Sequence, residues 1–154
     1  MKEQIEKLKI AGQVYIWKYT DKDRNYPGWN MTVDNSASQE LSQLLDMMEK
    51  CEWSTNKNIL TTRPTDNEIS APNNKNGVAK WTTKSKIIFS LKTNMTPDFW
   101  VTTETADELE ISFGKEKLKE LKDAIINISK GKGDHSIADK DDNNILTFWW
   151  RVGK

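Results

Sequence analysis

The chain has 154 residues, a length typical of one domain. Its 23 basic side chains balance 23 acidic ones, so the formal net charge is zero, and 36% of the residues are hydrophobic. This balance excludes a strongly basic protein that holds nucleic acid through its phosphates. No run approaches the ~20 apolar residues of a membrane-spanning helix. One cysteine and one histidine exclude an internal disulfide and a multi-histidine metal site.

The N-terminal residues predict the location of the protein and its first element. They lack the apolar run of about 7–15 residues that a secretory signal needs, so we expect a cytoplasmic protein. Residues 1–9 predict either one short helix, with Ile5 and Leu8 on one face, or a frayed terminus.

Several short segments predict β-strands by their β-branched, aromatic or alternating composition. Residues 13–19 are apolar on both alternating faces, which is typical of a central strand. Leu109, Ile111 and Phe113 alternate with polar residues, which predicts a strand with one solvated face. The predicted strands span residues 13–19, 29–33, 59–62, 81–92, 99–103, 109–113 and 145–152.

Two segments predict amphipathic helices, because apolar residues recur every three or four positions. The first runs from about Ser36 to Cys51, where Ser36 and Gln39 fit a capping box. The second runs over residues 115–129 and is stopped by Gly131 and Gly133. The apolar stripes of the two helices are Leu41, Leu44, Leu45 and Met48, then Leu118, Leu121, Ile125 and Ile128.

Runs of strands with few helices predict an α+β fold. We expect a mainly antiparallel sheet of about six strands, with the two amphipathic helices packed on one face. No repeat or linker divides the chain, so residues 1–154 form a single domain. Residues 64–77 predict a long loop with two prolines and four asparagines, and loops of that length often carry function.

The seven tryptophans are the main compositional signal, and all but Trp53 lie on or beside predicted strands. Either they fill the core of a small polar protein, or some form an exposed binding platform. Trp149 and Trp150 are consecutive, so in a strand they face opposite ways. We expect Trp149 to be partly exposed, on the same face as Arg151.

Two polar segments suggest chemistry without completing a motif. His135, beside Asp134, is the single histidine of the chain, and histidine is the residue type most often used for acid–base chemistry near neutral pH, but triad partners meet through the fold rather than in sequence. Asp139, Asp141 and Asn143 occupy positions 1, 3 and 5 of a calcium-loop pattern, whose bidentate Glu at position 12 is replaced by Trp150. We expect a weak cation site at most, and no cofactor.

Two strings suggest a resemblance that would span most of the chain. They are Arg24-Asn25-Tyr26-Pro27-Gly28-Trp29-Asn30-Met31-Thr32, and Gly131-Lys132-Gly133-Asp134-His135-Ser136-Ile137 followed by Phe148-Trp149-Trp150. Together they resemble small, uncharacterised bacterial proteins with a tryptophan-rich α+β domain, a group similar to immunity proteins of bacterial toxin systems. The resemblance implies a stoichiometric binding protein and transfers no catalytic residue.

The leading functional hypothesis is therefore a non-catalytic protein-binding domain, with an immunity-type inhibitor of a bacterial toxin as its narrower form. Nucleic acid and membrane are not expected as partners. One alternative is a small-ligand or carbohydrate-binding module with coplanar exposed aromatics, and a second is a small enzyme that uses His135 with Asp134. The expected binding residues are Trp149, Arg151, Trp29 and Tyr26, with Asn73 and Asn74 at the rim.

Overall fold

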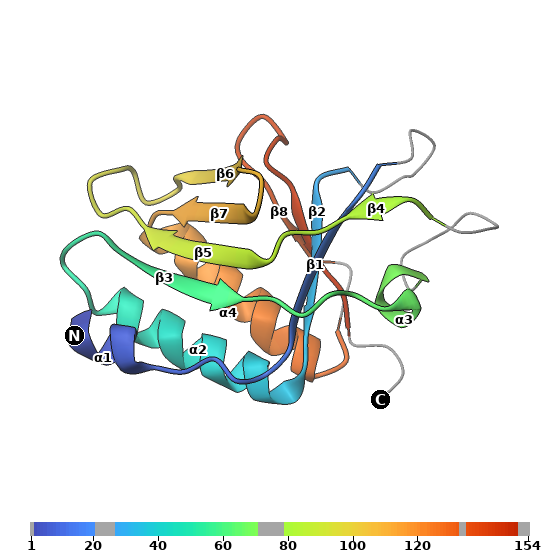
Figure 1. The fold of residues 1–154 in the computed structure, drawn as a ribbon. Helices are drawn as coiled ribbons and strands as arrows, with labels where there is room; N and C mark the ends of the chain where they lie inside the picture. Colours follow the sequence, from blue (N-terminus) through green and yellow to red (C-terminus); the bar gives the residue numbers. More distant parts are fainter. Residues whose placement is uncertain (1, 21–26, 71–78, 133–134, 151–154) are drawn as a thin grey trace.

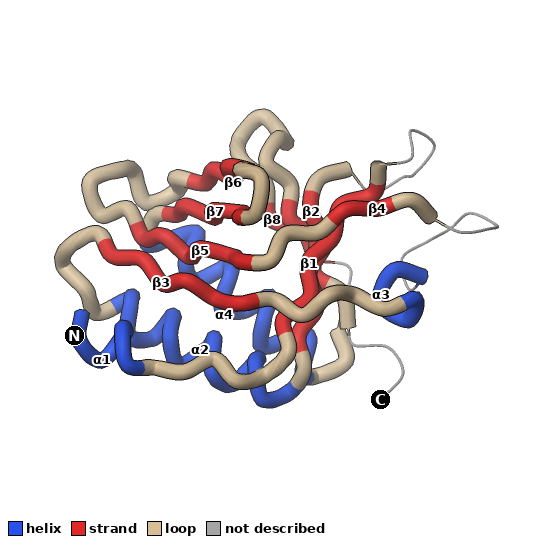
Figure 2. The backbone as a smooth tube through the Cα atoms, viewed as in Figure 1, coloured by secondary structure: helices blue, strands red, loops and turns tan. Residues whose placement is uncertain are grey.

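A computed structural model describes residues 2–20, 27–70, 79–132 and 135–150. These residues form an α+β fold of four helices and two mixed sheets (Figures 1 and 2). The helices are α1 (Lys2–Lys7), α2 (Asn35–Glu49), α3 (Asp66–Ser70) and α4 (Lys115–Ser129). The strands are β1 (Val14–Tyr19), β2 (Trp29–Val33), β3 (Thr55–Leu60), β4 (Trp81–Thr82), β5 (Lys86–Leu91), β6 (Trp100–Glu104), β7 (Glu108–Phe113), β8 (His135–Ile137) and β9 (Leu146–Phe148).

The four-stranded sheet has the order β3-β5-β7-β6 and lies over the helix pair α2 and α4 (Figure 1). β5 and β7 pair in parallel, whereas β3 and β6 pair antiparallel to their neighbours. Leu109, Ile111 and Phe113 are fully buried against the helices, while Glu110 between them is half-buried on the other face. The predicted half-buried strand is therefore confirmed, although Ser112 on the other face is buried as well.

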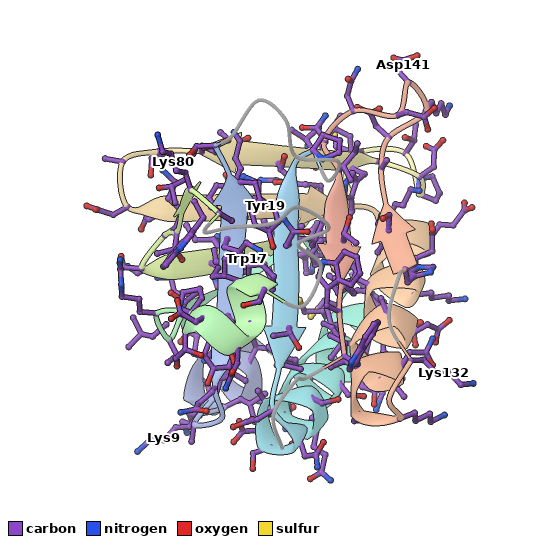
Figure 3. All side chains as sticks on the ribbon, turned by 90° about the vertical axis from the view of Figure 1, so that its right-hand side faces the viewer. Lys9, Trp17, Tyr19, Lys80, Lys132 and Asp141 are labelled. Carbon is purple, nitrogen blue, oxygen red and sulfur yellow. The ribbon has the colours of Figure 1, made fainter. Side chains whose placement is uncertain are left out.

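The five-stranded sheet has the order β4-β1-β2-β9-β8 and stands across one end of the helix pair (Figure 2). Its inner face adds Val14, Ile16 and Met31 to the main core. Figure 3 looks onto its outer face, where α3 lies in front of β1 and where Trp17 and Tyr19 belong to a second buried cluster. β1 is thus a central strand with two buried faces, as its composition predicts.

The two long helices begin and end through different local interactions. Asp34 caps α2 by accepting the Ala37 N–H at 2.8 Å, so the predicted capping box at Ser36 is wrong and the helix begins at Asn35. α4 spans the predicted residues 115–129. Gly131 follows it with φ +76° and donates its N–H to Ile128 O, a left-handed helix end for which glycine is suited.

The prediction of one mainly antiparallel sheet is wrong, because the structure has two sheets, each with a parallel pair: β2 with β9, and β5 with β7. Alternation of apolar residues reveals which side of a strand is buried, but not which strand lies beside it. The two amphipathic helices are confirmed.

Several predicted boundaries are also wrong. The segment 81–92 is broken into β4 and β5, which belong to different sheets. β3 begins at Thr55 rather than residue 59, and the last strand ends at Phe148. Helix α3 lies within the predicted loop 64–77, strand β8 follows α4, and α1 occupies the predicted first helix with Ile5 fully buried.

Asn144 joins the two sheets, because it precedes β9 of one sheet and hydrogen-bonds β6 of the other. Its Oδ1 accepts both the N–H and the hydroxyl of Thr102 at 3.1 Å, and its carbonyl accepts the Trp100 indole N–H at 2.7 Å. Its backbone is left-handed, with φ +57°, which Asn tolerates better than most residues. The outer edge of β6 is therefore covered by its own chain.

We expect Asn144→Ala to lower the free energy of unfolding by about 2 kcal/mol, since Thr102 loses its acceptor and alanine is strained at positive φ. Asn144→Gly loses the same hydrogen bonds without that strain, so its loss should be smaller by about 1 kcal/mol. Urea unfolding of both variants measures the difference. Equal stability of the wild type and Asn144→Ala would contradict the role assigned to this side chain.

Candidate functional site

The tryptophans divide into four buried residues, one half-buried residue and two exposed ones. Trp17, Trp29, Trp100 and Trp149 are at most 3% exposed, and Trp81 is half-buried. Trp150 is 38% exposed, whereas Trp53 is 80% exposed. The aromatic surplus predicted from the sequence is therefore found at Trp53, away from the strands.

The expected partial exposure of Trp149 is wrong. Its indole N–H donates to Asn30 Oδ1 at 2.9 Å, and its ring belongs to the buried cluster on the outer face of the five-stranded sheet. Both faces of this sheet are covered, so a residue that alternates to the opposite face of the strand is buried there as well. β9 ends at Phe148, and it is Trp150 that is partly exposed, with its ring at 66° to that of Trp149.

The other predicted binding residues do not form a described surface. Trp29 is only 2% exposed and packs in the main core, which leaves almost none of its surface for a partner. The remaining predicted residues, Tyr26, Asn73, Asn74 and Arg151, lie outside the described residues.

His135 lies on strand β8 and is exposed. The centre of its ring is 6.4 Å from that of Phe148, on the neighbouring strand. Its predicted partner Asp134 lies outside the described residues. Nothing around His135 in the described part of the chain assembles an acid–base pair.

The calcium-like segment is a turn that uses its own carboxylate. Asp139 Oδ1 accepts the N–H groups of Asp141 and Asn143, and its Oδ2 accepts the Asn144 amide. The Asn143 N–H and the Asn144 amide hold the pKa of the Asp139 carboxyl below its ordinary value. Within residues 2–20, 27–70, 79–132 and 135–150, no three His, Cys, Asp or Glu side chains gather to hold a metal ion.

A polar cleft of about 330 Å³ lies where the two sheets meet, and the predicted binding residue Trp29 is part of its lining. Lys18 donates to Glu104 Oε2 at 2.8 Å and lies 5.8 Å from the centre of the Trp29 ring. The Lys18 ammonium lowers the pKa of the Glu104 carboxyl. The two charged groups satisfy each other, so the cleft has no unmatched charge at this pair.

The strongest candidate for a binding surface lies at the opposite end of the helix pair from the five-stranded sheet. There the loop between α2 and β3 lies beside the loop between β5 and β6, at the left of Figure 1. Ser54 fastens them together: its hydroxyl accepts the Thr93 N–H at 3.0 Å and donates to Asn94 Oδ1 at 3.4 Å. These contacts hold a loop that exposes Trp53 next to a loop that exposes 45% of Met95.

Two adjoining hollows flank these apolar side chains. One of about 310 Å³ is lined by Trp53, the other, of about 380 Å³, by Met95, and both share Lys50, Cys51 and Glu52. Four lysines and one carboxylate line the pair of hollows, so their lining is basic although the whole chain is neutral. We call this region the Trp53 surface and define it by Trp53, Met95, Lys2, Lys50, Lys92 and Lys115.

Sequence reasoning missed this surface, although one signal pointed to it. Trp53 is the one tryptophan that lies off every predicted strand, directly after the end of the first helix stripe. Trp53 stands in a polar loop between Glu52 and Ser54, where no neighbouring residues in the sequence form an apolar face that could bury it. The lysines come from four separate stretches of the chain, and only the fold brings them to one end.

The polar cleft yields a prediction about the titration of Glu104. Lys18→Met should raise the pKa of the Glu104 carboxyl toward its ordinary value, because the hydrogen-bonded ammonium is its main cause of lowering. The folded-state pKa is depressed, so the pair stabilises the fold above the ordinary carboxyl pKa and loses this effect as the pH falls through the lowered value.

NMR titration of the Glu104 side-chain carbon measures this shift. Lys86→Met is the matched control, since Lys86 pairs with Glu108 instead. An unchanged Glu104 titration in Lys18→Met would contradict the assignment.

Comparison with known proteins adds no relative: no family description, curated protein or solved structure matches the chain. In the described part of the chain, no helix is both long and apolar enough to cross a membrane. The functional argument therefore rests on the geometry of the molecule.

Proposed function

We propose that the chain is a non-catalytic protein-binding domain whose docking site is the Trp53 surface. The observation that carries this proposal is the 80% exposure of Trp53 in a chain that buries four of its other tryptophans. A tryptophan left in water gains the most from burial against a partner, and tryptophan is enriched among residues that dominate binding energy.

The surroundings of Trp53 have the composition of an interface. Met95 adds a second exposed apolar group, and methionine adapts its shape to a partner. Lysines surround both residues and form a charged rim, which speeds association and selects partners of opposite charge. The proposed partner therefore presents an apolar hollow surrounded by Asp and Glu.

A narrower version of this proposal makes the partner a bacterial toxin that the chain inhibits, and it rests on the resemblance to immunity-type proteins. The carbohydrate-binding alternative requires coplanar exposed aromatics. The ring of exposed Trp150 lies beside that of Trp149, but Trp149 is buried and the two ring planes meet at 66°. The described residues therefore do not favour that alternative.

We expect Trp53→Ala to weaken partner binding by about 30-fold, the effect of a hot spot worth about 2 kcal/mol. To find the partner, the full chain is immobilised and exposed to a lysate of the cells whose genome encodes it, and the retained proteins are identified. The purified partner is then titrated against the wild type and the variant by calorimetry. Binding should also weaken as salt rises from ~50 mM to ~500 mM, because the lysine rim acts through long-range charge.

Trp150→Ala is the control, since Trp150 is a second exposed tryptophan outside the Trp53 surface. The stability of Trp53→Ala should match that of the wild type, because so exposed a side chain contributes little to the fold. The proposal fails if every retained protein binds Trp53→Ala as tightly as the wild type.

The narrower proposal predicts a growth phenotype. Expression of the identified partner alone should arrest growth, coexpression with this chain should restore it, and coexpression with Trp53→Ala should restore it less. Normal growth with the partner alone would reject the toxin assignment while leaving protein binding intact.

A further inference from the structure

The chain closes or shortens three of the four sheet edges that its described residues form. β4 and β8, at the ends of the five-stranded sheet, have two and three residues. β6, at one end of the four-stranded sheet, donates its Thr102 N–H to Asn144. Short strands and covered edges are the usual means by which proteins prevent unwanted strand pairing.

β3 is the exception, a six-residue strand at the margin of the four-stranded sheet (Figure 1). Its pairing with β5 continues to Thr61, whose N–H donates to Ser85 O. Backbone groups of an antiparallel edge strand alternate between the neighbour and the outside. Thr55, Lys57 and Ile59 therefore bond to β5, and the N–H and C=O groups of the alternate residues, Asn56, Asn58 and Leu60, point away from the sheet.

This open edge is continuous with the Trp53 surface. A groove of about 340 Å³ follows the edge, lined by Lys2, Glu6 and residues 54–58, and it shares Lys2, Ser54 and Thr55 with the hollow beside Trp53. Leu60, at the far end of β3, is 74% exposed. Trp53 and Leu60, the two most exposed large apolar side chains in the described residues, thus lie at the two ends of the same edge.

The charge of the groove indicates which occupant fits. Lys57 donates to the carbonyls of Ile5 and Glu6 at 2.8 and 3.0 Å, so its position is fixed while its positive charge is not neutralised by these acceptors. Lys2 adds a second positive charge against the single carboxylate of Glu6. A second copy of the chain would bring the same basic groove against its own copy across a two-fold axis, which disfavours self-pairing.

We infer that the free edge of β3 binds an extended, acidic segment of the partner protein as an added strand. This inference rests on the proposed function and specifies how the partner is held. The segment's backbone pairs with Asn56, Asn58 and Leu60, its Asp or Glu side chains face the lysines, and its apolar side chains reach Trp53 and Leu60. Backbone pairing supplies affinity and the side-chain contacts supply specificity.

The probe is a synthetic peptide, taken as the most enriched sequence from a phage-displayed library of random twelve-residue peptides selected on the full chain. We expect enriched sequences that alternate apolar residues with Asp or Glu. Asn58→Pro should weaken binding by at least about tenfold, because proline removes an outward N–H, and edge strands tolerate proline at such positions. Asn58→Ala, which changes only the side chain, should bind like the wild type.

Amide hydrogen exchange of the wild-type chain tests the inference without relying on the fold of a proline variant. Saturating peptide should slow exchange at Asn56, Asn58 and Leu60 by about tenfold or more, while the amides bonded to β5 serve as internal controls. Unchanged exchange at all three outward amides would overturn the inference.

The outcomes separate this inference from the proposed function. Binding that is lost in Trp53→Ala but kept in Asn58→Pro overturns the added strand and leaves the Trp53 surface. Binding that is lost in Asn58→Pro but kept in Trp53→Ala supports the added strand and removes Trp53 as its anchor. Failure to enrich any peptide, or sedimentation of a wild-type dimer that Asn58→Pro dissociates, overturns the inference.

Discussion

The hydrogen bonds of Asn144 link the two sheets directly, beside the hydrophobic core that both sheets share. Its Oδ1 serves β6 through Thr102, while its own chain continues directly into β9 of the other sheet. Asp139 fixes the loop through the Asn144 amide and two backbone N–H groups. One short segment therefore joins the sheets and accepts the Thr102 N–H at the β6 edge, whereas no described segment forms a backbone hydrogen bond to the outer edge of β3.

The same arrangement explains why so many aromatic side chains are hidden. The five-stranded sheet is covered on both faces, by the main core on one side and by α3 with the Tyr15, Trp17 and Tyr19 cluster on the other. The second face provides room for large rings that a single core of this size would not hold. Tyr19 ties α3 to this face, since its hydroxyl donates to Ile69 O at 2.5 Å. Of the tryptophans in the described residues, Trp53 therefore remains the most exposed.

Local signals in the sequence predicted local structure well. The apolar stripe of α4 predicts residues 115–129 and the segment of β2 predicts residues 29–33, and both ranges match the structure. Residues 55–58 are polar, so only pairing with β5 makes them a strand. Trp149 is buried in one cluster with Trp17 and Ile69, which are distant in sequence, and the lysines of the Trp53 surface come from separate elements. Contacts between segments that are distant in sequence cannot be recognised from the pattern of residues within either segment alone.

The composition of β3 favours pairing with a different protein over pairing with a second copy of the same strand. Asn56 and Asn58 have low strand propensity and exposed side chains, which weakens pairing between identical edges. Lys57 keeps a positive charge beside the backbone, and lysine on an edge opposes self-association. A partner strand that supplies acidic groups removes that repulsion, and one that supplies apolar groups covers Trp53 and Leu60. The features that protect this edge from self-assembly therefore also define the segment that it can accept.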